Sequence, residues 1–159
     1  MKVKATRQQK PTIDSVPSTP VERSRVGHII NMGLGDLIAF LIVGVIGLNS
    51  HGETLEPANL LRVTWPVALA WFVLSPFFGV FRRDLASKPG RMATRTALAW
   101  LVACVGALLL RSVFETQKPP PVSFAIVTLL TNLVALFIWR LPMAKHNQNK
   151  LAKAQEQQA

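Results

Sequence analysis

The sequence VTWPVALAWFVLSPFFGVF, residues 63–81, contains no charged side chain and is closed on both sides by arginine, at Arg62 and Arg82. A helix of this length rises about 28 Å, close to the roughly 30 Å hydrocarbon core of a bilayer. The stretch therefore predicts a transmembrane helix, and it decides how the rest of the sequence is interpreted.

Three further apolar runs follow the same rule, at residues 27–49, 96–110 and 121–139. The run 96–110 would rise only about 22 Å as a helix, but arginines at both ends can extend toward the headgroups and make up the difference. A buried helix of a soluble core is the alternative for so short a run, but its neighbours are long enough to span. We therefore expect an all-α, polytopic membrane protein, an antiparallel bundle of four transmembrane helices.

Basic residues are distributed unevenly around these runs. The chain has 159 residues, 50% hydrophobic and only 16% charged, yet its formal net charge is +10. Fifteen of the 18 Lys and Arg residues lie in the two tails and the loop between the second and third runs, and only Arg62, Arg111 and Lys118 lie on the other side. The positive-inside rule then places both termini and the middle loop in the cytoplasm, with the chain in the plasma membrane. Four basic residues are expected to anchor the inner ends of the spans: Arg82, Arg83, Arg95 and Arg140.

The positive charge is explained by this topology and by attraction to the anionic headgroups of the bilayer. A nucleic-acid-binding protein would carry its cations on one folded surface, so no nucleic-acid partner is expected. We predict a disordered basic tail at residues 1–26, a four-helix transmembrane domain at 27–141 and a polar cytoplasmic tail at 142–159. The single cysteine excludes an intramolecular disulfide and a multi-cysteine metal site, and no metal or cofactor is predicted.

Asp36 is the only acidic residue inside the four runs. A carboxylate near the centre of a span costs about 3 kcal/mol on insertion scales, so its environment is informative. Counting the helical rise from the inner end of each run brings polar residues of the other runs to the same depth. The predicted intramembrane polar layer consists of Asp36, Ser75, Cys104, Thr131 and Asn132. No Lys or Arg falls at this level, so Asp36 is predicted to be protonated or hydrated and to hydrogen-bond to Asn132.

This layer has two interpretations. Polar side chains commonly tie membrane helices together, which favours a structural role. A proton or ion relay is the functional alternative, although a single carboxylate provides only one ionisable group for coupled transport. Small residues support close packing, because Gly44 and Gly47 share a face with Asp36, and because alanines recur at every fourth position of the third run. Those alanines are Ala99, Ala103 and Ala107.

A second polar group is expected at the outer rim, formed by His51, Arg62, Arg111 and Ser123 together with Glu53. A solvated rim with weak salt bridges is the simpler interpretation. The alternatives are a site for an anionic or quinone-like headgroup, or a histidine ligand to a pigment or metal. A lone histidine without a second ligand at metal-binding spacing argues against the metal.

Aromatic residues are concentrated in residues 63–81 and can pack in the bundle, contact lipid, or receive another membrane subunit or a polycyclic cofactor. Trp65, Trp100 and Trp139 are expected near the membrane interfaces, whereas Trp71 lies too deep for an interfacial belt. Pro76 is expected to kink the helix. The sequence contains no GxSxG, HExxH or phosphate-binding glycine loop, so no catalytic site is predicted.

Several short elements resemble a family of small integral membrane proteins, the domain of unknown function 3054. They are Gly35-Asp36, Gly47, Ser50-His51-Gly52, Trp65-Pro66, Gly106, Arg111, Ser123-Phe124 and Trp139-Arg140. The resemblance extends over about residues 27–141. The family has no established activity to carry over, and the resemblance implies only that Asp36, His51, Arg111 and Arg140 are the positions to test first.

These observations favour a non-enzymatic membrane protein. The leading expectation is an accessory or structural subunit that packs beside a larger, energy-transducing membrane complex, with a membrane-protein partner or self-association. The alternative is a small proton-linked transporter or channel that uses Asp36. A membrane enzyme is the third possibility, with His51 and Arg111 as its candidate polar pair.

Overall fold

The computed structural model describes the backbone of residues 20–157 and the side chains of residues 26–157 except residue 116. Residues 1–19 of the predicted disordered tail lie outside this range. The described chain is entirely helical: α1 (Pro20–Ser50), α2 (Pro57–Leu74), the 3-10 helices η1 (Ser75–Phe78) and η2 (Arg83–Leu85), α3 (Pro89–Arg111), the π-helical turn η3 (Ser112–Thr116) and α4 (Val122–Glu156).

Four helical stretches are long and apolar enough to cross a membrane: Val26–Ser50, Pro57–Phe78, Pro89–Glu115 and Val122–Glu156. Each predicted span overlaps one of them, so the all-helical, four-span prediction is confirmed at this level. The predicted short run 96–110 belongs to the longer helix α3, which begins at Pro89. The added turns carry Arg91 and Arg95, so the uncharged part of this helix is still residues 96–110.

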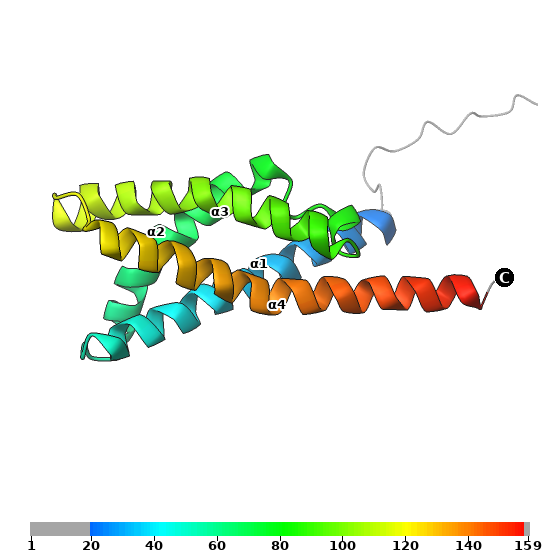
Figure 1. Ribbon diagram of the computed structural model, residues 1–159, viewed down its shortest axis with the longest axis horizontal. Helices are drawn as coiled ribbons and strands as arrows, with labels where there is room; N and C mark the ends of the chain where they lie inside the picture. The colour runs from blue at the N-terminus through cyan, green and yellow to red at the C-terminus, as the bar shows by residue number, and fades with distance from the viewer. Residues whose placement is uncertain (1–19, 158–159) are drawn as a thin grey trace, which may run out of the picture.

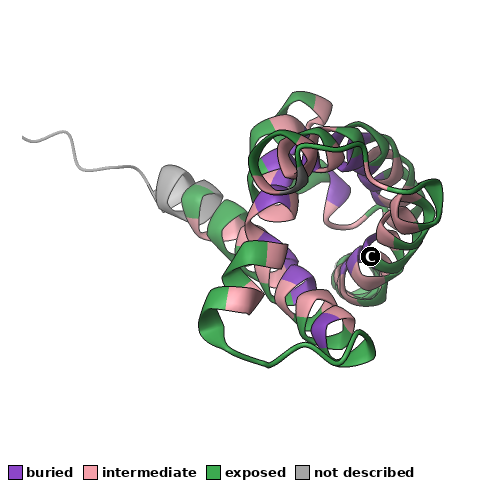
Figure 2. Ribbon diagram, turned by 90° about the vertical axis from the view of Figure 1, so that its left-hand side faces the viewer, coloured by how far each residue is buried: buried purple, intermediate pink, exposed green. Residues whose placement is uncertain are grey.

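The helices form a closed ring of contacts. α1 packs against α2, α2 against α3 and α3 against α4, and α4 returns to pack against α1. Figure 1 shows the α1–α2 turn and the α3–α4 turn at one end of the molecule, with the α2–α3 connection and the C-terminus toward the other end. Figure 2 shows that the buried residues line the inner faces of the helices. The ring brings the first and last helices of the chain into direct contact.

The ends of the helices follow from proline and glycine. α2 and α3 each have proline in their first turn, where its missing N–H removes no hydrogen bond. Pro76 was predicted to kink a continuous helix, but α2 ends at Leu74 and Pro76 lies in η1. Proline lacks the N–H that would continue the α-helix, and Gly79 then reverses the chain with a φ of 63°.

The central core is built from aromatic rings and small residues. Trp71 and Trp100 are fully buried. The ring centroid of Phe40 lies 6.1 Å from that of Trp71 and 5.7 Å from that of Trp100. The predicted alanine stripe of α3 is buried, with exposed fractions of 0% at Ala99 and Ala103 and 3% at Ala107. Small side chains at these positions let the two tryptophans fill the centre of the ring.

The predicted positions of tryptophan and glycine are partly wrong. Trp100 was expected at the inner interface, but it lies in the core and its Nε1 donates a hydrogen bond to the carbonyl oxygen of Leu129 at 2.8 Å. Gly44 does face a neighbour, because a methyl group there would lie 2.8 Å from Oγ1 of Thr64. Gly47 has no such neighbour within 4 Å, so it does not form part of the packing face.

α1 and α4 both extend beyond their predicted limits. α1 begins at Pro20, inside the predicted disordered tail, and α4 continues through the predicted polar tail to Glu156. The first part of this extension belongs to the fold: Ala144 is buried beside Leu85, and Nδ2 of Asn147 donates to the carbonyl oxygen of Ala86 at 3.2 Å. α4 therefore packs against the α2–α3 connection before it projects outward.

Candidate buried ion-pair site

The interior of the ring holds a carboxylate and a guanidinium in direct contact. Nε of Arg140 lies 2.7 Å from Oδ1 of Asp36, and Nη2 of Arg140 lies 2.5 Å from Oδ2. Both side chains have an exposed fraction of 0%. Two parallel N–H···O bonds between a planar guanidinium and a carboxylate are the geometry in which this pair is strongest. The pair joins α1 to α4, the first and last helices of the chain.

A third N–H group donates a hydrogen bond to the carboxylate of Asp36. Nε1 of Trp71, on α2, donates to Oδ2 of Asp36 at 2.8 Å. Both carboxylate oxygens thus accept N–H groups, and no described interaction offers an acceptor for a carboxyl proton. These contacts match a carboxylate, and they bring three helices together at one point.

Aromatic rings enclose the guanidinium. Cζ of Arg140 lies 5.4 Å from the ring centroid of Trp71, 5.5 Å from that of Phe81 and 5.7 Å from that of Trp139. A cation near the face of an aromatic ring is attracted by the ring quadrupole, and this attraction grows when water is excluded. Nη1 of Arg140 has no hydrogen-bond partner among the described residues, so the rings supply its surroundings.

A glycine lets the two helices approach closely enough for this pair. A methyl group at Gly35 would lie 2.6 Å from Cη2 and Cζ2 of the Trp139 ring. Gly35-Asp36 on α1 therefore meets Trp139-Arg140 on α4 as one unit, ring against backbone and carboxylate against guanidinium. The two dipeptides were noticed separately in the sequence, and the structure places them in contact.

The side-chain pattern of each helix explains why these residues face inward. Every fourth residue of α4 is buried over three turns, and the same spacing of four buries part of α1. On α4 these residues are Asn132, Leu136, Arg140 and Ala144; on α1 they are Met32, Asp36 and Phe40. Asp36 and Arg140 thus lie within stripes of mostly apolar buried residues. When the two helices pack along these stripes, both charged side chains are buried together.

The predicted surroundings of Asp36 are therefore wrong in two respects. Arg140 does reach Asp36, whereas no cation was expected at its level. The predicted hydrogen bond to Asn132 is not formed, because Nδ2 of Asn132 donates to the carbonyl oxygen of Thr128 at 3.0 Å. Thr131 is exposed, and its hydroxyl donates a hydrogen bond to the carbonyl oxygen of Val127 at 2.7 Å. It therefore lies outside any buried layer.

The other members of the predicted layer are buried without contacting Asp36 in any described interaction. Ser75 has an exposed fraction of 0%, and its Oγ has no described hydrogen-bond partner. Cys104 is 3% exposed and packs in the core with Trp71. Ser75 and Cys104 are thus buried separately from Asp36. The connected polar group inside the ring consists of Asp36, Arg140 and Trp71.

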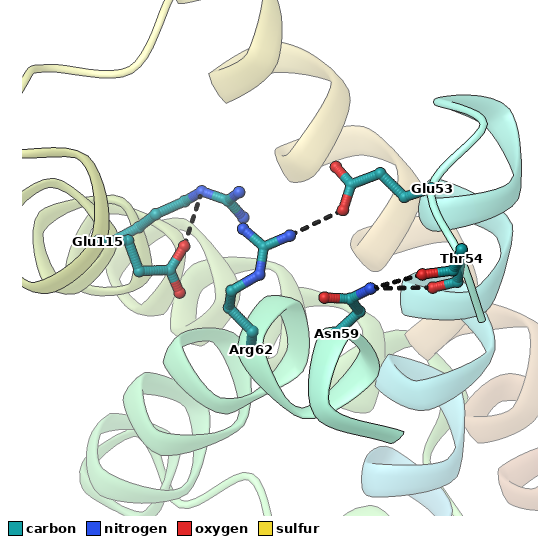
Figure 3. A network of polar contacts seen from close by, with 6 residues as sticks. Glu53, Thr54, Asn59, Arg62 and Glu115 are labelled. Carbon is teal, nitrogen blue, oxygen red and sulfur yellow. Dashed lines mark hydrogen bonds and ion pairs between the residues drawn. The ribbon is translucent and has the colours of Figure 1, made fainter. Parts of the chain in front are cut away.

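The outer rim consists of two ion pairs. Nη2 of Arg62 lies 2.7 Å from Oε2 of Glu53, and Nε of Arg111 lies 3.5 Å from Oε2 of Glu115 (Figure 3). Cζ of Arg111 also lies 4.9 Å from the ring centroid of Phe124.

The histidine and serine predicted for this rim add nothing to these pairs. His51 and Ser123 are exposed, and no described interaction joins His51 to Arg111. The exposed Arg62–Glu53 pair fits the solvated-rim interpretation, in which such pairs contribute little to stability, whereas the side chains of Arg111 and Glu115 are only 23% and 11% exposed.

Three of the predicted anchors lie at the end of the bundle that carries the α2–α3 connection, whereas Arg140 is buried. Nε of Arg82 lies 3.0 Å from Oδ1 of Asp84, and this hydrogen bond lowers the pKa of the Asp84 carboxyl below its ordinary value. Nη1 of Arg95 lies 3.4 Å from the carbonyl oxygen of Phe78. Arg83 is exposed in the same connection. No group of three or more metal-ligating side chains occurs in the part of the chain that the structure describes.

Comparison with known proteins identifies the family of the chain. The family model described as "Protein of unknown function (DUF3054)" matches residues 33–143, and the chain belongs to this family. The matched region includes both Gly35-Asp36 and Trp139-Arg140. The resemblance identified from scattered residues is thereby confirmed. No curated protein and no solved structure matches the chain.

Proposed function

We propose that the chain is a multi-pass plasma-membrane protein, an antiparallel four-helix bundle with both termini in the cytoplasm, and that it acts as a non-enzymatic accessory or structural subunit beside a larger membrane complex. The observation that carries the proposal is the ion pair of Asp36 and Arg140. Its two charges satisfy each other and are sealed from solvent, which supports a structural role in joining α1 to α4 and leaves neither charge available to a substrate.

The outer surface supports a role in contacts within the membrane. Large apolar side chains are exposed on all four long helices, as expected where lipid or another apolar helix is the neighbour. An apolar groove of about 400 Å³ runs between α2 and α3. It is lined by Leu69, Ala70, Val73, Leu74, Gly106, Leu109, Leu110, Val113 and Phe114. A groove of this kind can receive the side chains of a partner helix.

Co-purification tests the accessory role. The full chain, extracted from its native membrane in mild detergent, should carry a stoichiometric membrane-protein partner. Val73→Trp fills the groove and should reduce recovery of the partner several-fold. Val134→Trp, the same change at an equally exposed position of α4, is the matched control and should leave recovery unchanged. Recovery of the wild-type chain alone would overturn the proposal.

The proposed topology has its own test. In a Cys104→Ala background, Ser87→Cys should react with a membrane-impermeant maleimide only after the cells are opened, and Thr54→Cys should react in intact cells. Ser87 lies in the α2–α3 connection with the arginines, and Thr54 lies in the turn after α1. The reverse pattern would overturn the orientation while leaving the accessory role open.

The proton-linked alternative requires Asp36 to exchange protons. Each such exchange would have to break its bonds to Arg140 and Trp71 inside a closed core. We therefore expect vesicles containing the wild-type chain to show the same proton permeability as protein-free vesicles, measured with an internal pH dye. A flux that Asp36→Asn abolishes would favour the alternative.

A further inference from the structure

A groove with a volume of about 820 Å³ lies at the α2–α3 connection. Its lining comes from α1, from the end of α2 and from the connection: Ile29, Gly33, Phe72, Pro76, Gly79, Phe81, Arg82, Arg83 and Asp84. This volume falls within the range of cavities that bind small organic ligands. One side of the groove is apolar, and the other carries the charged residues.

Arg82 and Arg83 line the groove, and Arg95 lies beside it, next to Gly79. Gly79 marks the position: a methyl group there would lie 2.8 Å from Nη1 of Arg95 and 2.9 Å from Cδ of Arg82. Arg83 lines the same groove. Bringing cations together costs Coulomb energy unless an anion lies among them. Among the described residues that line the groove, Asp84 is the one carboxylate.

The Arg82–Asp84 contact does not close the site. Its side chains have exposed fractions of 61% and 43%, and exposed ion pairs of this kind contribute little to stability. A stronger anion, such as a phosphate with several acceptor oxygens, can therefore compete with Asp84 for Arg82.

The apolar side of the groove determines what kind of phosphate compound fits. Gly33 and Phe72 form part of it, and a methyl group at Gly33 would lie 3.4 Å from Cε1 of Phe72. The groove thus continues from the arginines onto the faces of α1 and α2, which carry exposed apolar residues in their spans. A free phosphate would leave this apolar side unused, whereas an acyl chain would cover it.

We propose that this groove is a binding site for one acidic phospholipid, with the phosphate held by Arg82, Arg83 and Arg95 and the first part of an acyl chain lying against Ile29, Gly33 and Phe72. Basic pockets between transmembrane helices are the usual sites for anionic headgroups. The proposal goes beyond the accessory role, and the proposed orientation enters only in assigning the lipid to the cytoplasmic leaflet.

Native mass spectrometry of the full chain tests this site. The chain is released from nanodiscs that contain phosphatidylglycerol and phosphatidylcholine in equal amounts, and the phospholipid retained on the chain is identified. We expect the wild-type chain to retain one phosphatidylglycerol in preference to phosphatidylcholine. Since a hydrogen bond to a charged group changes binding by roughly tenfold or more, Arg82→Gln with Arg83→Gln should reduce the preference by at least about tenfold.

Lys88→Gln with Arg91→Gln is the matched control. Both residues are exposed at the same end of the molecule, neither lines the groove, and the change in charge is the same. The control should keep the wild-type preference. Equal loss in both double variants would show diffuse attraction to the surface and overturn the proposal, as would a wild-type chain without a preference.

Two further measurements complete the test. The first asks whether free phosphate can replace the lipid headgroup, and the second asks whether the acyl chain contributes to binding. Inorganic phosphate should not displace the retained phospholipid, and displacement would assign the groove to free phosphate instead. Gly33→Leu fills the apolar side and should reduce retention several-fold with all three arginines present. Its thermal unfolding in detergent identifies any loss of fold, and unchanged retention in a folded variant would overturn the acyl-chain assignment. Failure of these measurements leaves the co-purification test unaffected.

Discussion

Replacing Arg140 by Met should lower the free energy of unfolding by about 3–5 kcal/mol, the range found when one partner of a buried ion pair is removed. The variant leaves the Asp36 carboxylate inside the ring with Trp71 Nε1 as its only described donor. The cost arises from this uncompensated charge more than from lost packing, because Met fills part of the space that the arginine side chain occupied. Titration with sodium dodecyl sulfate, followed by circular dichroism, measures the change.

A second substitution separates the charge from the shape. Asp36→Leu combined with Arg140→Met removes both charges, and we expect it to recover most of the lost stability, since apolar replacements of a buried pair are often neutral or stabilising. Recovery should be incomplete by about 1–3 kcal/mol, because Nε1 of Trp71 then lacks its acceptor. Arg91→Met, at an exposed position of α3, is the control and should change little. If Arg140→Met unfolds like the control, the ion pair does not stabilise the bundle.

Gly35→Ala should lower the free energy of unfolding by about 1–3 kcal/mol, the usual cost of overpacking a core. The added methyl group would lie 2.6 Å from the Trp139 ring, so α1 must move away from α4 or the ring must leave its position. Either movement also lengthens the contact between Asp36 and Arg140. The same denaturant titration measures the effect, and loss of the native Trp fluorescence reports the displaced ring.

The matched control lies on the same helix. Gly47→Ala adds the same methyl group where nothing lies within 4 Å, and alanine favours the helix over glycine, so stability should stay the same or rise slightly. Trp139→Leu should relieve much of the Gly35→Ala defect by making room for the methyl group. Equal effects of the two glycine substitutions would contradict the close approach of α1 and α4 at Gly35.

The membrane fold could be predicted because its signal is physical and local. An apolar run such as residues 63–81 must satisfy its backbone hydrogen bonds within itself when it enters hydrocarbon, and a helix does this. The ends of the helices were harder to predict. Polarity marks where a side chain leaves hydrocarbon, whereas the helix continues as long as its backbone bonds and its packing allow, as α4 does to Glu156.

The buried ion pair was missed because Arg140 was taken as the end of a span. Depth was then counted backward from it, which placed Asn132 opposite Asp36. In the structure α1 extends 16 residues before Asp36 and α4 extends 16 residues after Arg140, so neither residue is near a helix end. Helical periodicity contained the missing signal: a spacing of eight puts Arg140 on the face of Asn132, which was already expected to point inward.

Trp71 was the second missed residue, and its signal was indirect. It lies too deep for the aromatic belt at the interface, and an indole N–H at that depth needs an acceptor. Asp36 was the only carboxylate within the spans, so the two requirements could have been matched. The aromatic rings around Arg140 could not be predicted in the same way, since they depend on how α2 and the following connection pack in three dimensions.

The ion pair joins residues that are 104 positions apart, and this separation has a consequence for biosynthesis. A ribosome adds roughly 5–20 residues per second, so Asp36 emerges about 5–20 s before its partner is made. During that interval the carboxyl group of Asp36 lacks its guanidinium partner. The pair can form only when the last helix arrives, so we expect a chain that terminates before Arg140 to leave the core incomplete.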